Sequence, residues 1–262
     1  MDKEMAIAKE NEKKLKEIGA KFNFDVWYAE AWSRRQGYLS FKLANNLKKK
    51  FEAEKKTINS VLDVCSGSGE FLNVMSNFVK TCVGVDNAEG YLQLVRSKFK
   101  NIEFIKIKDL YKFDLKRKFD LVTCNHDVIN MFLKFVDWET FFKVVYNHLE
   151  NDGMFIFDFY TDKKMKEWDF VSFEQDYTLD YVQSVKRQYD ACVMDEVYYI
   201  RESETLYRKT ADTMIETSFP TEQIIKALEK AGFVDLQYID VNLEPLEDLE
   251  NVGRIHIMCK KK

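Results

Sequence analysis

Two glycines and a later aspartate carry the clearest chemical signal in this chain. Gly67 and Gly69 follow the apolar run 61–64, and Asp86 follows a second apolar run, 81–85. Glycine adopts positive φ readily and places no side chain in the way of a ligand. A carboxylate at the end of the second strand of such a unit can accept hydrogen bonds from ribose hydroxyls. The order of strand, glycine turn, helix, strand and acid therefore predicts a βαβ unit that binds a nucleoside.

The elements that must position these residues lie in the same segment. Residues 61–64 and 81–85 predict two parallel strands, and residues 70–78 predict the helix between them. The first amides of a helix are unpaired and carry partial positive charge, so they suit a carboxylate or a phosphate. One part of a nucleoside ligand is thus matched at each end of the unit.

The glycine spacing distinguishes between nucleoside cofactors. Dinucleotide-binding enzymes use G-x-G-x-x-G, and Leu72 stands at the third glycine position here. The segment instead resembles motif I of the class I S-adenosylmethionine-dependent methyltransferases, D-x-G/A-x-G-x-G, although Cys65 departs from it. The resemblance implies S-adenosyl-L-methionine as cofactor and S-adenosyl-L-homocysteine as product. It implies cofactor contacts at Asp63, Cys65, Ser66, Gly67, Gly69, Asp86, Asn87, Asp109, Leu110 and Asn125.

The following segments predict the rest of a parallel sheet. Residues 102–107 alternate as a strand that ends near Asp109, where the family places a group against the adenine. Residues 119–124 resemble motif IV of the same family. A helix over 137–149, capped by Asp137, and a strand over 154–160 follow after a turn at 151–153. Alternating strands and helices of this kind predict right-handed crossovers and a parallel sheet.

The exit of the strand 119–124 supplies the candidates for catalysis. Side chains at the carboxyl ends of parallel strands line the ligand crevice, so this loop should face the reacting methyl group. His126 is a candidate general base because its ordinary pKa is near neutral, and Asp127 is placed to orient it or to bind an ammonium substrate. Tyr160, at the end of its strand, is a candidate hydrogen-bond donor to the substrate. The alternatives are that His126 caps its loop and that Tyr160 closes the core.

The N-terminal residues 1–40 predict a helical cover. Residues 1–18 read as a charged amphipathic helix, and residues 22–38 are rich in aromatic side chains. In similar methyltransferases an aromatic ring of this segment lies over the methionine part, and a ring face attracts a cation by about 0.5 to 2 kcal/mol. Tyr28 and Trp32 are the candidates for this contact. Arg34 and Arg35 are placed to pair with a cofactor carboxylate. The alternative is that the rings only pack this segment onto the sheet.

Residues 170–219 form a second addition to the sheet. Three stretches in them alternate as strands, and few helix starts interrupt them. An antiparallel sheet inserted here resembles a subgroup of small-molecule methyltransferases, among them aminosugar N-methyltransferases, and would form a wall at the crevice mouth. The alternative is a dimer surface. Pro220 and Gly232 bound a helix over 221–231, and strands over 233–241 and 254–260 follow.

The predicted fold is thus α/β, with a Rossmann-like seven-stranded, mostly parallel sheet whose last strand pair is antiparallel. An inserted antiparallel sheet and an N-terminal helical cover complete it. The expected domains are the cover at 1–40, the methyltransferase core at 41–169, the inserted β subdomain at 170–219 and the end of the core at 220–262.

Composition narrows the function. The net charge of −4 over 262 residues and the absence of an unmatched basic cluster favour neither nucleic acid nor a membrane as partner. Five scattered cysteines without C-x-x-C spacing predict reduced thiols in a cytoplasmic protein, with neither disulfides nor a metal site. The chain is expected to be a monomer or a homodimer. A run of about 18 apolar residues, typical of a membrane span, is not present.

Missing motifs restrict the acceptor. An N/D-P-P-Y sequence at the exit of strand 119–124 is typical of enzymes that methylate adenine bases or glutamine amides, and the two prolines of this chain, Pro220 and Pro245, lie elsewhere. We therefore expect in-line transfer of a methyl group to a nitrogen or oxygen of a small metabolite. The alternatives are a methyltransferase that acts on RNA or protein and a non-catalytic binder of S-adenosylmethionine.

Overall fold

The structure, a computed structural model, describes residues 10–11, 13–15, 17–18 and 24–262. Most of the helix expected over 1–18 lies outside the described residues, as does Phe22. The described residues between 10 and 18 are helical. Among them Leu15 is buried against Ala191 and Ile215, which belong to the inserted sheet.

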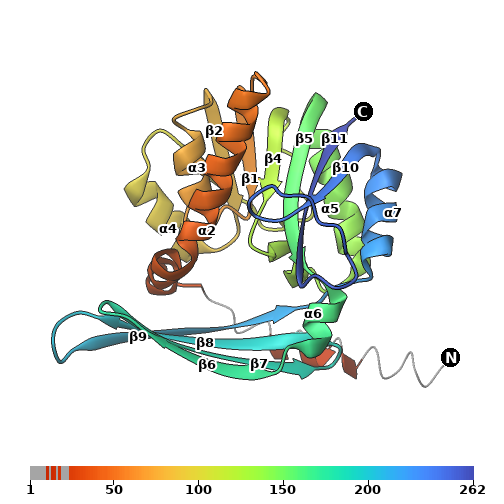
Figure 1. Cartoon of the computed structure of the whole chain (residues 1–262). Coiled ribbons are helices and arrows are strands. Elements are labelled where there is room, and N and C mark those ends of the chain that lie inside the picture. The colour runs from red at the N-terminus through yellow and green to blue at the C-terminus, as the bar shows by residue number, and fades with distance from the viewer. Residues whose placement is uncertain (1–9, 12, 16, 19–23) are drawn as a thin grey trace.

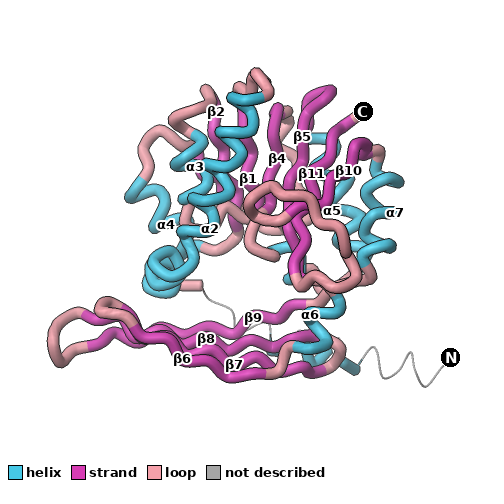
Figure 2. Tube along the Cα trace, viewed as in Figure 1, coloured by secondary structure: helices cyan, strands magenta, loops and turns pink. Residues whose placement is uncertain are grey.

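A seven-stranded sheet in the order β10-β11-β5-β4-β1-β2-β3 forms the centre of the molecule (Figures 1 and 2). Its strands are β1 (Ser60–Val64), β2 (Thr81–Asp86), β3 (Glu103–Lys106), β4 (Phe119–Cys124), β5 (Leu149–Tyr160), β10 (Phe233–Ile239) and β11 (Arg254–Lys261). Strands β1 to β5 are parallel, whereas β11 pairs antiparallel with both β5 and β10. The predicted fold class is confirmed.

Helices cover both faces of this sheet. On one face lie α2 (Val26–Ala53), α3 (Glu70–Met75) and α4 (Glu89–Lys98), and on the other lie α5 (Phe135–His148) and α7 (Thr221–Ala231). The alternation of strand side chains fills both layers, since Val61 packs under the first group and Leu62 and Val64 pack under the second. Crossovers of this kind leave the carboxyl ends of β1, β2 and β4 together at one edge.

A second, four-stranded antiparallel sheet lies below that edge (Figure 1). It consists of β6 (Phe170–Gln175), β7 (Leu179–Gln188), β8 (Ala191–Arg201) and β9 (Tyr207–Glu216) in sequence order, so the segment predicted from three stretches has four strands. The short helix α6 (Asp162–Glu167) leads into it from β5. At its other chain end, β9 leads back to helix α7 (Thr221–Ala231) of the core, so the inserted segment is joined to the core at both of its chain ends.

Helix α2 joins the two sheets. Its first half packs Tyr28 and Ala31 against Tyr181 and Tyr198 of the second sheet, and its second half packs Leu43, Ala44, Leu47 and Phe51 into the core. Asp25 caps the helix by accepting a hydrogen bond from the Tyr28 amide at 2.8 Å. The boundary expected at residue 40 thus falls inside one continuous helix.

Several element ends differ from those predicted. Helix α5 begins at Phe135, with Lys134 rather than Asp137 at its N-cap. Strand β5 begins at Leu149, because Leu149 pairs with Phe119 and a register shift takes up the residues 151–153 that were expected to form a turn. Helix α3 ends at Met75, and Ser76 bonds the carbonyl of Asn73 instead of extending it to residue 78.

Candidate active site

A cavity of about 1370 Å³ lies between the carboxyl ends of the parallel strands and the second sheet. Most of the residues expected to bind a cofactor or act in catalysis line it. These are Trp32, Asp63, Cys65, Ser66, Gly67, Asp86, Asn87, Asp109, Leu110, Asn125, His126, Asp127 and Tyr160. Tyr28 and Gly69, which were also expected there, are not among the lining residues.

The turn after β1 has the backbone geometry that its glycines predict. Cys65, Gly67 and Gly69 all have positive φ, at 59°, 50° and 80°. A Cβ at Gly67 would meet no atom nearer than 4.0 Å, so glycine here keeps the cavity clear. A Cβ at Gly69 would lie 3.0 Å from Val95 and Phe99. The second glycine therefore serves the packing of the turn onto α4 rather than the cavity.

Asp86 holds this turn from the end of β2. Its carboxylate is 5% exposed and accepts hydrogen bonds from the amides of Gly67 and Ala88, each at 2.9 Å. Burial raises the pKa of Asp86, and the backbone hydrogen bonds oppose this effect. Each carboxylate oxygen can accept a second hydrogen bond. Asp86 thus presents two oriented acceptors at the cavity wall.

Polar atoms without partners surround the same part of the cavity. Among the described residues, Ser66 Oγ and Asn125 Oδ1 are buried and make no hydrogen bond. Asn125 is oriented by Asp63, which accepts from Asn125 Nδ2 at 3.3 Å and from Thr123 Oγ1 at 2.6 Å. Burial raises the pKa of Asp63 to about 7. Buried polar atoms usually have partners, so these fit a polar ligand.

The start of helix α3 differs from the expected anion site. Glu70 lies in its first turn, and its carboxylate accepts hydrogen bonds from the hydroxyls of Ser33 and Ser68. A second carboxylate at this helix end would meet a like charge.

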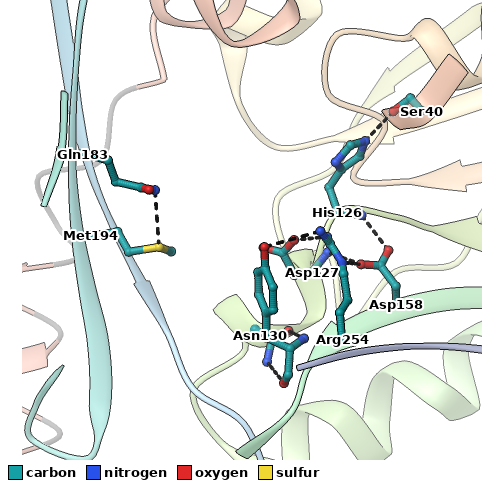
Figure 3. A network of polar contacts seen from close by, with 9 residues as sticks. Ser40, His126, Asp127, Asn130, Asp158, Gln183, Met194 and Arg254 are labelled. Atoms are coloured by element: carbon teal, nitrogen blue, oxygen red, sulfur yellow. Dashed lines mark hydrogen bonds and ion pairs between the residues drawn. The ribbon is translucent and has the colours of Figure 1, made fainter. Parts of the chain in front are cut away.

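The loop after β4 is held by residues that the sequence reasoning missed. Asp158 of β5 accepts hydrogen bonds from the amides of His126, at 2.7 Å, and Asp127, at 3.0 Å, and both loop residues have positive φ. Arg254 of β11 pairs with Asp158, Nε to Oδ2, at 2.6 Å and also with Asp127 (Figure 3). A signal for Asp158 was present, since it is an acid between two phenylalanines of a strongly apolar strand.

His126 is neutral in this environment. Its Nε2 lies 2.6 Å from Ser40 Oγ, and its ring makes an edge contact with Trp32 at 5.0 Å between centroids. Burial, and then the charge of Arg254, lower its pKa to about 4. The imidazole can accept a hydrogen bond at neutral pH, but it is a weak base there.

Tyr160 lies against Arg254 and Trp168. Arg254 stands over the tyrosine ring at 4.6 Å, with Nη1 3.4 Å from the hydroxyl oxygen, and Trp168 makes an edge contact at 4.4 Å. Burial raises the pKa of Tyr160, so its hydroxyl remains a proton donor. Asn130 fixes the strand end by bonding both the amide and the carbonyl of Tyr160.

The aromatic cover has one of its two expected members at the cavity. Trp32 lines the wall between His126 and Tyr91. Tyr28 instead points into the junction of α2 with the second sheet, where its hydroxyl donates to Glu196 and its ring packs edge-on against Tyr198 at 5.4 Å. For Tyr28 the packing alternative therefore describes the structure, because the four-stranded sheet covers that face of the helix.

The two arginines of this segment are already paired. Arg34 bonds Glu30 one helical turn earlier, and Arg35 pairs with Glu174 at 2.8 Å while lying 3.7 Å over the ring of Tyr181. Arg35 nevertheless lines the cavity.

The second sheet and α6 supply the opposite wall of the cavity, at the crevice mouth where the sequence predicted that the inserted sheet would lie. Figure 3 shows Gln183 and Met194 across the cavity from Arg254 and its two carboxylate partners, Asp127 and Asp158. The other residues on this side are Lys164, Trp168, Phe170, Glu196, Met214 and Glu216. The cysteines are free thiols, and the described residues contain no group of His, Cys, Asp or Glu arranged for a metal ion. No helix in the described part of the chain is both long enough and apolar enough to cross a membrane.

Comparisons with known proteins agree with this geometry. Residues 61–153 match the family model of a methyltransferase domain. A protein of Geobacillus sp. (strain WCH70) that bears the name of a methyltransferase is 24% identical in an alignment of 212 positions that covers 77% of this chain and 84% of that protein.

Solved methyltransferases share the fold at low identity. An S-adenosylmethionine-dependent methyltransferase of Clostridium acetobutylicum has a TM-score of 0.75 at 23% identity, over 84% of this chain and 91% of that one. DesVI of Streptomyces venezuelae has a TM-score of 0.76 at 17% identity, over 90% of this chain and 98% of that one. An amino pentose methyltransferase of Micromonospora echinaspora, solved with S-adenosylmethionine bound, has a TM-score of 0.68 at 19% identity, over 84% of this chain and 90% of that one.

Proposed function

Because this chain carries a methyltransferase domain on the fold of the S-adenosylmethionine-dependent methyltransferases, we propose that it transfers a methyl group to a nitrogen or oxygen of a small molecule. The observation that carries the proposal is Asp86, which the turn amide of Gly67 and the amide of Ala88 hold at the wall of the cavity. A cavity of about 1370 Å³ exceeds the ~300–1,000 Å³ of a typical single-ligand pocket, which supports a site for two molecules.

The residues around the glycine turn fit S-adenosylmethionine. Asp86 would accept hydrogen bonds from the ribose hydroxyls, and Gly67 leaves room for the ligand beside it. Ser66 Oγ and Asn125 Oδ1, buried without partners among the described residues, would bond polar groups of the cofactor. Asp109 and Leu110 would contact the adenine, as the family resemblance implies. Trp32 would cover the methionine part.

Methyl transfer would take place near His126, Asp127 and Tyr160, and it needs little from the protein beyond positioning of the acceptor. The cofactor supplies a methyl group on a sulfonium sulfur, which is an excellent leaving group. Holding an acceptor atom in line within about 3 to 3.5 Å of that carbon contributes about 7 to 11 kcal/mol in favourable cases. The loop of His126 and Asp127, fixed by Asp158, and the hydroxyl of Tyr160 are the groups that would hold the acceptor.

His126 enters this proposal as a hydrogen-bond acceptor rather than a strong base. Its pKa of about 4 leaves it unprotonated at neutral pH. Replacement His126→Ala should therefore raise KM more than it lowers kcat. An unchanged KM and kcat would remove His126 from the site.

Cofactor binding and turnover test the function together. Calorimetry should show binding of S-adenosylmethionine and S-adenosylhomocysteine, and a screen of amines, phenols and carboxylates should find acceptors that drive formation of S-adenosylhomocysteine. Tight NAD binding with no response to S-adenosylhomocysteine would overturn the proposal. The free thiols of the chain support a cytoplasmic location. A monomer or a homodimer remains our expectation for the assembly.

A further inference from the structure

Glu216, a residue that no motif singled out, lies at the end of β9 on the cavity wall. Its side chain is 2% exposed, and Oε2 has no hydrogen-bond partner within the described residues. The adjacent Thr217 fixes its position, because the Thr217 amide donates to the carbonyl of Asn130 at 2.8 Å and Asn130 Nδ2 donates to the carbonyl of Thr217 at 2.7 Å. Glu216 is thereby held against the loop that follows β4.

The carboxylate of Glu216 lies beside that of Asp127, and the two interact directly. Asp127 shares Arg254 with Asp158, so one guanidinium serves two carboxylates. Among the described residues, no ion pair joins Glu216 to a cation of its own. This part of the cavity therefore holds three acidic groups, Asp127, Asp158 and Glu216, around the single guanidinium of Arg254.

Glu196 shows how the same sheet satisfies a buried carboxylate when it serves the structure. It is 3% exposed and also lies on the cavity wall. The hydroxyls of Tyr28, Tyr181 and Tyr198 and the side-chain amide of Gln183 all donate to it. Glu216 has no such set of donors in the described chain. A buried carboxylate costs several kcal/mol unless it is paired or hydrogen-bonded, so Glu216 needs donors from outside the protein or a proton.

We propose that Glu216 and Asp127 form a subsite for the ammonium group of an amine acceptor. The inference rests on the proposed methyl transfer and adds to it both the class of acceptor and a residue that selects it. An ammonium carries three N–H donors and a positive charge, and both match two adjacent carboxylates. A hydroxyl acceptor offers one donor and no charge. The walls beside the subsite, formed by Trp168, Met194 and Met214, suit an apolar body behind the amine.

The subsite also accounts for the proton that an amine must lose. The ammonium gives one proton to the Glu216–Asp127 pair, and this exposes the nitrogen lone pair. The nitrogen then forms a bond to the methyl carbon while the carbon–sulfur bond breaks and its electron pair stays on sulfur. A methylated ammonium and a neutral thioether result. Burial raises the pKa of both carboxyls, although Arg254 opposes the shift, so the pair can hold this proton.

Matched amines and alcohols test the subsite. Calorimetry on the full chain saturated with S-adenosylhomocysteine would compare cyclohexylamine with cyclohexanol and benzylamine with benzyl alcohol. We expect the wild-type protein to bind each amine at least tenfold more tightly than its alcohol. Glu216→Gln should keep the affinity for S-adenosylhomocysteine and reduce the preference for amines to under threefold. Asp195→Asn, an equal change of charge at an exposed position of β8, should keep the preference.

Equal binding of the paired amine and alcohol by the wild-type protein, or binding of neither, overturns the inference whether or not the variant folds. It is also overturned if Glu216→Gln weakens S-adenosylmethionine but not S-adenosylhomocysteine, because the carboxylate then serves the sulfonium. Failure of the wild-type protein to bind S-adenosylhomocysteine defeats the proposed function itself. Loss of amine preference with intact cofactor binding concerns the subsite alone, so the two failures are distinguishable.

Discussion

Replacement of Asp86 by alanine should weaken cofactor binding strongly while leaving the fold intact. The carboxylate uses one acceptor site on each oxygen for the amides of Gly67 and Ala88 and keeps a second on each oxygen for a ligand. Two hydroxyls of a bound ribose would thus make two hydrogen bonds to a charged acceptor. Alanine removes both, and it also removes the carboxylate that holds the glycine turn by accepting from the Gly67 amide.

The size of the effect follows from these bonds. A hydrogen bond to a charged group contributes about 1.5–3 kcal/mol, so two contribute about 3–6 kcal/mol. At about 1.4 kcal/mol for each factor of ten, the dissociation constant of S-adenosylhomocysteine should rise at least ~100-fold. Asp86→Asn, which keeps one carbonyl oxygen as acceptor, should lie between the wild-type protein and the alanine variant.

Calorimetric titration with S-adenosylhomocysteine measures this change directly, with circular dichroism to verify that each variant is folded. Glu103→Gln is a suitable control, because Glu103 is exposed at the start of β3, pairs with Arg117 and lies off the cavity wall. A folded Asp86→Ala protein whose dissociation constant stays within twofold of the wild-type value would refute the assignment of Asp86 to the ribose.

Three further changes test the framework of the site. Asp158→Asn should lower the free energy of unfolding in urea by about 1–3 kcal/mol, because the loop amides and Arg254 lose a charged acceptor while Arg254 keeps its ion pair with Asp127; an unchanged value contradicts this. Gly90→Ala should cost about 1–3 kcal/mol and speed proteolysis before α2, because a Cβ there would overlap the backbone of Phe24. An unchanged cleavage rate would argue against this contact. Burial raises the pKa of Asp63 from 3.8 to about 7, so the folded protein binds more protons than the unfolded chain in that range and loses stability as pH rises through it. An asparagine at this position does not titrate, so the Tm of Asp63→Asn minus the Tm of the wild-type protein should increase from pH 5 to pH 8 in scanning calorimetry. A difference in Tm that stays constant over this range would contradict the raised pKa of Asp63.

Local sequence patterns determined the elements of this protein and the place of the candidate cofactor site. Helix α7 runs over Thr221–Ala231 as predicted, because its apolar spacing, the preceding Pro220 and the following Gly232 each act within a few residues. The glycine turn and Asp86 lie together for a similar reason, since one βαβ unit contains them all. Short-range rules of turn geometry and strand alternation are sufficient for such features.

Contacts between distant segments were decided only by the tertiary structure. Arg254 reaches Asp158 because β11 pairs antiparallel with β5 in a register that sets Arg254 opposite Tyr160, and no local pattern fixes that register. Glu216 reaches Asp127 because β9 returns to the core at Asn130. Tyr28 turned from the cavity because the second sheet offered its hydroxyl the carboxylate of Glu196. The sequence by itself determined which side chains could bind a cofactor, whereas the packing of two sheets around α2 decided which charges face each other across the cavity.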